Sequence, residues 1–410
     1  MSRTELDRPE SVEEQDPHRA DGDKKQKSKR PANTAFRQQR LKAWQPILTP
    51  RSVLPLFFVI GTIFAPLGGV LLWASSQVQE IVIDYSDCKT QAPVGTFSPI
   101  PDKVTATFKS TQQTQTPSWQ RTMVQRPILK NQTTVCSLLF EIPNDLPPPV
   151  FLYYRLTNFY QNHRRYVQSL DLDQLMGKPL SNSTIAGSTC DPLTTDPATG
   201  KAYYPCGLIA NSIFNDTIYS PALVGVDAGN ITYEMTNKGI AWDSDKQIYK
   251  KTQYQNSQVH PPPNWHDRYP NGYNDETPIP NINEDEELMV WMRTAGLPSF
   301  SKLSRRNDTT PMKAGVYRLD IDDYFPVTEY SGTKSILIST RTVMGGRNPF
   351  MGIAYVVVGG ICIVLGALFT VAHLVKPRKM GDHTYLTWNN DQHATAVTTG
   401  RDDRFGSHAL

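Results

Sequence analysis

The chain has 410 residues, of which 39% are hydrophobic, and its 42 Lys and Arg against 39 Asp and Glu give a formal net charge of +3. A charge so close to zero does not suit a protein that binds nucleic acid through a broad basic surface. The length would allow two or three ordinary domains. The informative feature is the uneven distribution of charged groups along the chain.

Residues 1–33 mix both charges and contain almost no large apolar side chains. Such a segment cannot bury enough surface to offset the entropy of folding, so we expect a disordered tail. Residues 34–51 follow and contain "TAFRQQRLKAWQPIL". This juxtamembrane strap, as we name it, places basic and amide side chains, an indole and a proline directly before a long apolar run.

Two stretches of 28 residues have no Asp, Glu, Lys or Arg, one between Arg51 and Glu80 and the other between Arg347 and Lys376. Each contains the roughly 20 apolar residues that a helix needs to cross a bilayer. We predict transmembrane helices at 52–75 and 349–375. A cleaved signal peptide would have a shorter apolar core nearer the start, and a buried helix of a soluble protein would show a polar face.

Basic residues predict the orientation of the two spans, because positively charged loops stay in the cytosol. Residues 1–51 carry 12 basic and 8 acidic groups, and residues 376–410 carry 5 and 4. The segment between them carries 25 and 27. Both tails, including 376–410, are therefore predicted to be cytosolic, facing anionic lipid headgroups. Residues 76–348 would form a lumenal or extracellular domain.

Four of the five cysteines, Cys88, Cys136, Cys190 and Cys206, fall in this middle segment. An oxidising compartment would join them as two disulfides, for which three pairings exist. We prefer Cys88 with Cys136 and Cys190 with Cys206, because "CDPLTTDPATGKAYYPC" is a turn-rich loop whose closure contributes about 3 kcal/mol. The same segment contains all the N-x-[ST] acceptors of the chain, Asn131, Asn182, Asn215, Asn230 and Asn307, which predicts N-glycosylation.

Within the middle segment, short β-rich runs alternate with turn clusters. We predict strands at "EIVIDY", "KVTATFK", "VFLYYRL", "AGVYRLDI" and "KSILIST" in a mainly antiparallel, β-sandwich-like core. A helix is expected in "NEDEELMVWMRTAG", with Asn283 as its N-cap and Gly296 as its end. Two proline-rich segments, "PNDLPPPV" and "HPPPNWHDRYPNGYNDETPIPN", are expected to be long ordered arms, and the second carries aromatic residues that must pack.

Both predicted spans carry a stripe of small residues. The stripe of the first consists of Gly61, Ala65, Gly68 and Gly69, and that of the second of Gly352, Gly359 and Gly366, with Cys362 on the same face. Small residues allow helix backbones to approach closely within a bilayer. These stripes predict that the two helices pack on each other or on a partner.

Chemistry-bearing motifs are absent from the sequence. The spans have no Asp, Glu, Lys or Arg to mark an ion pathway, and no phosphate-binding or hydrolase motif occurs. The acidic run with Asp320, Asp322 and Asp323 is interpreted as solvent-facing acids on a strand rather than a metal or catalytic site. His163, with the Arg164–Arg165 pair, is interpreted as part of a packed and solvated surface. We expect no catalytic residues, no metal and no cofactor.

Six blocks of sequence resemble the cell division control protein 50 family. They read "FRQQRLKAWQPILTP", "YYRLTNFYQNHRRYVQS", "CGLIANSIFNDT", "KGIAWDSDK", "VWMRTAGLPSFSKL" and "GGRNPFMGIAYVVVGG", and the similarity covers about residues 34–375. The family comprises the accessory β subunits of phospholipid flippases, the type IV P-type ATPases. The resemblance implies a non-catalytic subunit in a heterodimer, through which the ATPase folds, leaves the endoplasmic reticulum and moves phospholipids to the cytosolic leaflet.

Membership would place the protein in the endoplasmic reticulum, the Golgi or endosomes, or the plasma membrane. Two other classes share parts of the pattern. A subunit of a two-span ligand-gated channel has the same plan, although four lumenal cysteines are few for that class. An enzyme on a two-span anchor would need a motif that is missing.

The strap acquires a second interpretation from the resemblance. Basic residues suffice for a topology signal, but they do not account for Gln38, Gln39 or Pro46. We therefore predict that the strap lies along the cytosolic face and contacts the ATPase. The contact residues proposed are Phe36, Arg37, Gln38, Gln39, Arg40, Trp44 and Pro46.

Overall fold

The computed structural model describes residues 34–41, 49–101, 103–110, 115–126, 132–226, 229–341 and 346–377. The chain forms two compact units, residues 1–55 and 56–410. Helix α1, Pro50–Ser76, begins in the first unit and continues into the second. The second unit also contains a domain of strands and short helices, here called the globular domain, and helix α9, Phe350–Val375.

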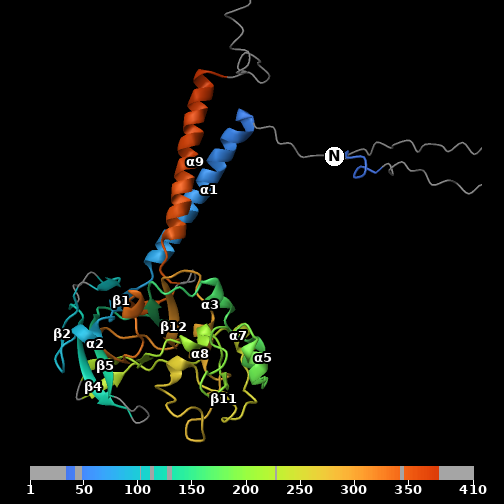
Figure 1. Ribbon diagram of the computed structural model, residues 1–410. Helices are drawn as coiled ribbons and strands as arrows, with labels where there is room; N and C mark the ends of the chain where they lie inside the picture. The colour runs from blue at the N-terminus through green and yellow to red at the C-terminus, as the bar shows by residue number, and fades with distance from the viewer. Residues whose placement is uncertain are drawn as a thin grey trace, which may run out of the picture. The chain divides into compact units, whose positions relative to one another are not determined.

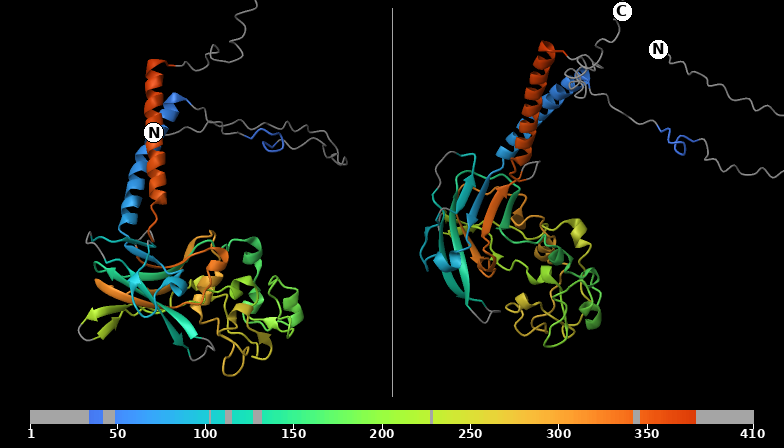
Figure 2. Two further views of the ribbon diagram at one scale, coloured as in Figure 1. Left: turned by 60° about the vertical axis from the view of Figure 1, so that its left-hand side comes forward. Right: turned by 45° about the horizontal axis from the view of Figure 1, so that its top comes forward.

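Helices α1 and α9 are both long and apolar enough to cross a membrane. Their sequences have no Asp or Glu, and apart from Arg51 no Lys or Arg, so every turn can face hydrocarbon. In residues 56–410 the two helices lie side by side and leave the globular domain from the same side (Figures 1 and 2). The two predicted spans are thus continuous helices.

A five-stranded antiparallel sheet carries the ends of the chain segment between the helices. Its strand order is β12, β6, β14, β1, β3. The strands are β1 Glu80–Asp84, β3 Val104–Thr107, β6 Val150–Leu156, β12 Phe300–Asn307 and β14 Lys334–Thr340. Strands β1 and β14 are central neighbours, and they directly follow α1 and precede α9 along the chain. The helix pair is therefore attached to the middle of this sheet.

The second sheet has seven antiparallel strands in the order β10, β9, β13, β5, β4, β2, with β8 also paired to β13. The strands are β2 Ser98–Pro99, β4 Ser118–Gln125, β5 Gln132–Ile142, β8 Thr217–Ile218, β9 Ala222–Val226, β10 Gly229–Thr232 and β13 Gly315–Asp322. Side chains from both sheets belong to one hydrophobic core, as in a β-sandwich. This confirms the predicted architecture.

Short elements lie between the strands and on one side of the sheets (Figure 2). The α-helices are α2 Cys88–Gln91, α3 Arg164–Gln168, α4 Leu172–Leu175, α5 Asn182–Ala186, α6 Leu208–Asn211, α7 Asp243–Lys246 and α8 Glu286–Met292. The 3₁₀ turns are η1 Pro263–Trp265 and η2 Thr328–Tyr330, and β7 Ala202–Tyr203 pairs with β11 Val259–His260 in parallel. Trp265, Tyr269 and Tyr273 of the second proline-rich arm are buried, which confirms that this arm is packed.

The predicted helix near residue 290 exists, but both of its ends differ from the prediction. Its N-cap is Asp285, whose carboxylate accepts from Leu288 N at 2.9 Å. Asn283 instead donates its side-chain amide to Tyr249 O at 2.8 Å. The helix stops at Met292, before Gly296, because Lys302 donates to the terminal carbonyls of Trp291 and Arg293, each at 2.6 Å.

Strands β4, β5 and β12 were not predicted. Strand β5 is buried along almost its whole length on both faces, so its sequence has no alternation of polar and apolar residues. Strand β12, "FSKLSRRN", is polar, yet Lys302 and Ser304 are buried in it. Their burial depends on hydrogen-bond partners that are distant in sequence, which a local pattern does not record.

Candidate functional site

The interface between α1 and α9 is built on the two small-residue stripes. A Cβ added at Gly359 would lie 2.7 Å from Ala65 N, and one added at Gly61 would lie 2.9 Å from Gly359 O. At Gly68 an added Cβ would lie 2.8 Å from Gly352 O. These distances are too short for real side chains, so the backbones touch because the residues are glycine. The helices pack on each other through the predicted stripes.

Two further glycines of the stripes, Gly366 and Gly69, make a looser contact or none in this interface. An added Cβ at Gly366 would lie 3.3 Å from Phe57 Cβ and 3.3 Å from the ring of Phe58, which is a looser contact. Gly69 has no atom within 4 Å of an added Cβ, so it lies outside the interface between α1 and α9. It follows Gly68 directly, and one residue corresponds to about 100° of rotation around a helix. Cys362 is a free cysteine of intermediate exposure.

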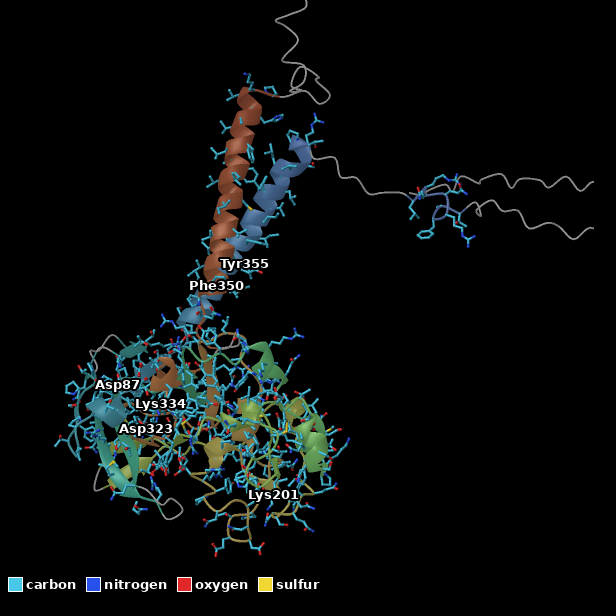
Figure 3. All side chains as sticks on the ribbon, in the orientation of Figure 1. Asp87, Lys201, Asp323, Lys334, Phe350 and Tyr355 are labelled. Carbon is cyan, nitrogen blue, oxygen red and sulfur yellow. A yellow bond between two sulfur atoms is a disulfide. The ribbon has the colours of Figure 1, made fainter. Side chains whose placement is uncertain are left out.

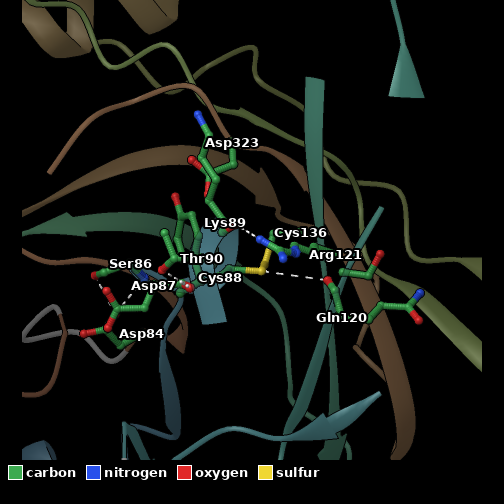
Figure 4. The surroundings of a disulfide bond; sticks show 12 residues. Asp84, Ser86, Asp87, Cys88, Lys89, Thr90, Gln120, Arg121, Cys136 and Asp323 are labelled. Atoms are coloured by element: carbon green, nitrogen blue, oxygen red, sulfur yellow. Dashed lines mark hydrogen bonds between the residues drawn. A yellow bond between two sulfur atoms is a disulfide. The ribbon is translucent and has the colours of Figure 1, made fainter. Parts of the chain in front are cut away.

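A disulfide joins Cys88 of α2 to Cys136 of β5, with Cα atoms 6.1 Å apart (Figure 4). Helix α2 follows β1 of the five-stranded sheet, whereas β5 is central in the seven-stranded sheet. Both sulfur atoms are buried in the common core. The bond thus links the two sheets close to β1, the strand that follows α1 along the chain.

The second disulfide joins Cys190 to Cys206, with Cα atoms 5.6 Å apart. The loop that it closes is held by buried polar groups: Cys206 N donates to Gln174 Oε1 at 2.8 Å, and Ser169 Oγ donates to Cys190 O at 3.0 Å. Gly207 (φ 98°) has no room for a Cβ, which would lie 2.1 Å from Ser169 O. The loop is therefore fixed to the chain around α3 and α4.

A buried ionic cluster lies where the two sheets meet, and Figure 3 labels its residues Lys334 and Asp323. Lys334 Nζ donates to Asp216 Oδ2 and to Asp323 Oδ1, each at 2.7 Å. Asp216 also accepts from Tyr85 Oη at 2.9 Å. All four side chains are buried. Burial raises the pKa of the Asp323 carboxyl although Lys334 opposes the shift. Burial also raises the pKa of Tyr85, and the charge of Asp216 raises it further.

The cluster corrects the interpretation of the acidic run. Asp322 and Asp323 have only 3% and 5% of their surface exposed, so they are not solvent-facing. Asp322 accepts from Arg126 and from Tyr219 Oη, the latter at 3.0 Å. Asp320 is half-buried and pairs with Arg318. Each carboxylate has a separate partner, so the run is a set of structural contacts. His163, Arg164 and Arg165 are exposed, as predicted.

The described part of the strap, residues 34–41, is a run of turns. Gln38 N donates to Thr34 O at 2.9 Å and Arg40 N donates to Ala35 O at 2.7 Å. Gln39 has a positive φ of 53°. The side chains from Phe36 to Arg40 are exposed. Trp44 and Pro46 lie outside the described residues.

The sequons differ in how their asparagine side chains are bonded. Asn307 donates its amide to Glu234 O at 2.8 Å and to Thr310 Oγ1 at 2.7 Å. Asn182 is exposed and accepts from Ala202 N at 3.0 Å, and Asn215 is exposed without a side-chain hydrogen bond among the described residues. Asn131 lies outside the described residues, and Asn230 is described only as backbone of β10.

The sequence was compared with known proteins. Residues 71–379 match the LEM3 (ligand-effect modulator 3) family / CDC50 family. The chain is similar to the phospholipid-transporting ATPase accessory subunit CRF1 of Saccharomyces cerevisiae, at 46% identity over 365 residues, which cover 89% of this chain and 90% of that protein.

Two further relatives extend the similarity. The phospholipid-transporting ATPase accessory subunit CDC50 of Chaetomium thermophilum is 45% identical over 371 residues, covering 88% of this chain and 91% of the relative. The cell cycle control protein 50A of Mus musculus is 38% identical over 360 residues, covering 84% and 89%. The likeness therefore covers most of the chain, and the residues matched by the family include the whole globular domain and α9.

Proposed function

The chain belongs to the LEM3/CDC50 family, and from this membership we propose that it is the accessory β subunit of a phospholipid flippase, bound to a type IV P-type ATPase. The observation that carries the proposal is the similarity over about nine tenths of both chains to proteins named as accessory subunits of phospholipid-transporting ATPases. The partner hydrolyses ATP and moves phospholipid to the cytosolic leaflet.

The accessory role is non-catalytic in this proposal. The subunit allows the ATPase to fold, to leave the endoplasmic reticulum and to complete its phosphorylation cycle in the Golgi, endosomes or plasma membrane. The globular domain lies on the exoplasmic side and both termini lie in the cytosol, which is supported by the basic flanks and by the two disulfides. The strap contacts the cytosolic face of the ATPase, supported by its exposed side chains.

Affinity purification of the full-length chain from mild detergent is expected to recover one large ATPase in a one-to-one ratio. Replacement of Gln38, Gln39 and Trp44 by alanine preserves every charge of the strap, so it should leave the orientation intact and reduce the recovered ATPase. Arg37→Ala with Arg40→Ala removes two charges that the proposed contact also uses, so this variant should reduce the recovered ATPase as well. A homotrimer without a large partner would contradict the proposed function and favour a channel subunit.

If the globular domain is exoplasmic, we expect Asn215 to be glycosylated and Asn307 not to be. Thr→Ala substitution in each sequon tests this without changing the asparagines. Thr217→Ala is expected to remove one glycan, because Asn215 is exposed on the exoplasmic domain. Thr309→Ala is expected to leave electrophoretic mobility unchanged, because both N–H groups of Asn307 are used in hydrogen bonds within the fold. Mobility before and after endoglycosidase treatment measures both. A wild-type chain that shows no shift on deglycosylation would overturn the orientation.

A further inference from the structure

A cleft of about 790 Å³ opens beside the edge of the five-stranded sheet. Its walls come from the chain around α7, from the C-terminal end of α8, and from strands β6 and β12. Four of the six sequence blocks that carry the family resemblance contribute to it, through Tyr153, Trp242, Arg293 and Gly346 among others. The two disulfides and the interface of the helix pair do not explain why these four blocks meet at the cleft.

The floor of the cleft is an unpaired sheet edge. Strand β12 is the outermost strand of its sheet. Beyond it, among the described residues, only the main chain of Thr236 bonds to the main chain of β12, exchanging two N–H···O bonds of 2.9 Å with Arg306. Along the rest of β12, no strand among the described residues covers the outer side. An open edge of this kind binds extended segments readily, so proteins normally cover it.

The register identifies the main-chain groups that point into the cleft. Thr157 N donates to Thr333 O, on the side of β6 that faces β14. Main-chain groups of successive residues in a strand point to opposite sides, so the N–H and C=O groups of Tyr154 point toward β12, where Tyr154 pairs with Lys302. Ser301 and Leu303 therefore direct their N–H and C=O groups away from β6. Both residues line the cleft. They offer the donors and acceptors that an added antiparallel or parallel strand requires.

An exposed indole stands on the opposite wall. Trp242 has 64% of its surface exposed, and the guanidinium carbon of Arg293 lies 3.7 Å from its ring centroid. Arg293 in turn donates to both carboxylate oxygens of Asp245, at 2.9 and 2.7 Å. The indole is thus held on one side and open on the other. A rigid, exposed aromatic side chain is typical of an anchor in a protein interface.

One basic side chain of the cleft has no acidic partner among the described residues. Lys246, Arg293 and Arg306 form ion pairs with Glu286, Asp245 and Asp308, and burial lowers the pKa of Lys302 to about 7. Arg341 also lines the cleft, and no carboxylate of the described residues pairs with it. The electrostatic complement of Arg341 is an acidic side chain on the occupant.

The position of the cleft favours an occupant that emerges from the membrane nearby. Arg341 directly follows β14, and Gly346 shortly precedes the start of α9 at Phe350. One end of the cleft is therefore at the base of the helix pair. An exoplasmic loop of a membrane protein beside α1 and α9 would reach it without a long linker.

We propose that this cleft binds an extended, acidic exoplasmic segment of the ATPase, which adds a strand to β12 at Ser301 and Leu303 and contacts Trp242. Main-chain hydrogen bonds to the edge supply affinity, and the indole and Arg341 supply selectivity. The inference rests on the proposed function, because it names the surface through which the globular domain holds its partner.

Co-expression of the full-length chain with the ATPase, followed by purification in mild detergent, tests the proposal through the ratio of the two proteins. Ser301→Pro removes an outward N–H, and Trp242→Ala removes the anchor; each is expected to lower the recovered ATPase about tenfold. Ala106→Pro is the matched control, because Ala106 occupies an exposed, outward-facing position on β3, the opposite edge of the same sheet.

Charge and position are tested separately. Arg341→Glu should weaken the complex, whereas Lys201→Glu, at a site remote from the helix pair (Figure 3), should not. A photo-crosslinking residue in place of Trp242 should label an acidic exoplasmic loop of the ATPase. Labelling of lipid or of a second copy of this chain would overturn the proposal. Undiminished recovery with Trp242→Ala and Arg341→Glu would do the same while leaving the proposed function intact, whereas failure of the wild-type chain to recover an ATPase would refute that function.

Discussion

Substitution of Lys334 by methionine is expected to lower the free energy of unfolding of the globular domain by about 3–5 kcal/mol, the usual result of removing one partner from a buried ionic cluster. Lys334 has 1% of its surface exposed and donates to two carboxylates and to Phe325 O. Burial lowers its pKa, but Asp216 and Asp323 raise it by more, so the net shift is upward. Without the ammonium, two buried carboxylates face each other.

The midpoint of thermal unfolding of the purified full-length chain in detergent measures this loss. Lys313→Met is the matched control, because Lys313 forms an exposed pair with Asp145 that contributes little. A triple variant that also changes Asp216 and Asp323 to Asn should recover much of the lost stability, since no uncompensated charge remains. Equal midpoints for Lys334→Met and Lys313→Met would contradict the assignment of a stabilising cluster.

The pH dependence of the Lys334→Met variant has a definite sign. Burial already raises the pKa of Asp323, and the variant loses the cation that opposes this shift. Between the pKa of Asp323 in the unfolded chain and its raised pKa in the folded variant, the folded variant holds a proton on Asp323 that the unfolded chain has released. Stability rises as pH falls wherever the folded state binds more protons. The deficit relative to the wild-type chain should therefore be larger at pH about 7.5 than at about 5, because the lower pH favours the protonated form of Asp323.

Replacement of Cys190 and Cys206 by serine is expected to cost about 2–5 kcal/mol and to retain the chain in the endoplasmic reticulum. The disulfide closes a loop whose ends are bonded to Gln174 and Ser169. Opening it frees the loop and leaves these buried polar groups without fixed partners. The recovered ATPase should fall in parallel, because in the proposed function the accessory subunit leaves the endoplasmic reticulum with its partner.

Cys362→Ser supplies the control for the disulfide variant. Cys362 is the free cysteine of the described residues and lies in α9, so its loss changes no covalent link. Maturation of the N-glycans and co-purification of the ATPase measure the two effects. Arrival of the double serine variant at the wild-type membrane with a full complement of ATPase would show that the loop is dispensable.

Some features of the molecule follow from local sequence alone. An uncharged apolar stretch that spans the hydrocarbon of a bilayer forms a helix there, because no water is present to satisfy its backbone N–H and C=O groups. Gly352, Gly359 and Gly366 recur every seven residues, which returns them to nearly the same face of a helix. Successive side chains of a strand point to opposite faces, so the alternation of polar and apolar residues in β13 identified a strand before its partners were known.

Other features depend on partners that are remote in sequence. Asp322 and Asp323 follow the strand pattern of solvent-facing acids, yet both are buried because Arg126, Tyr219 and Lys334 reach them from other elements. The cost of burying a carboxylate is decided by those contacts and not by its neighbours along the chain.

The difference between features set by local sequence and features set by tertiary contacts has a physical cause. Length, apolar periodicity and cysteine placement are local or additive, so the sequence by itself determined the helix pair, its packing face and the β-rich domain between the helices. The pairing of Lys334 with Asp216, which lie 118 residues apart, and the cleft beside β12 were decided only by the tertiary structure. Charge compensation and an open sheet edge exist only after distant segments have been brought together.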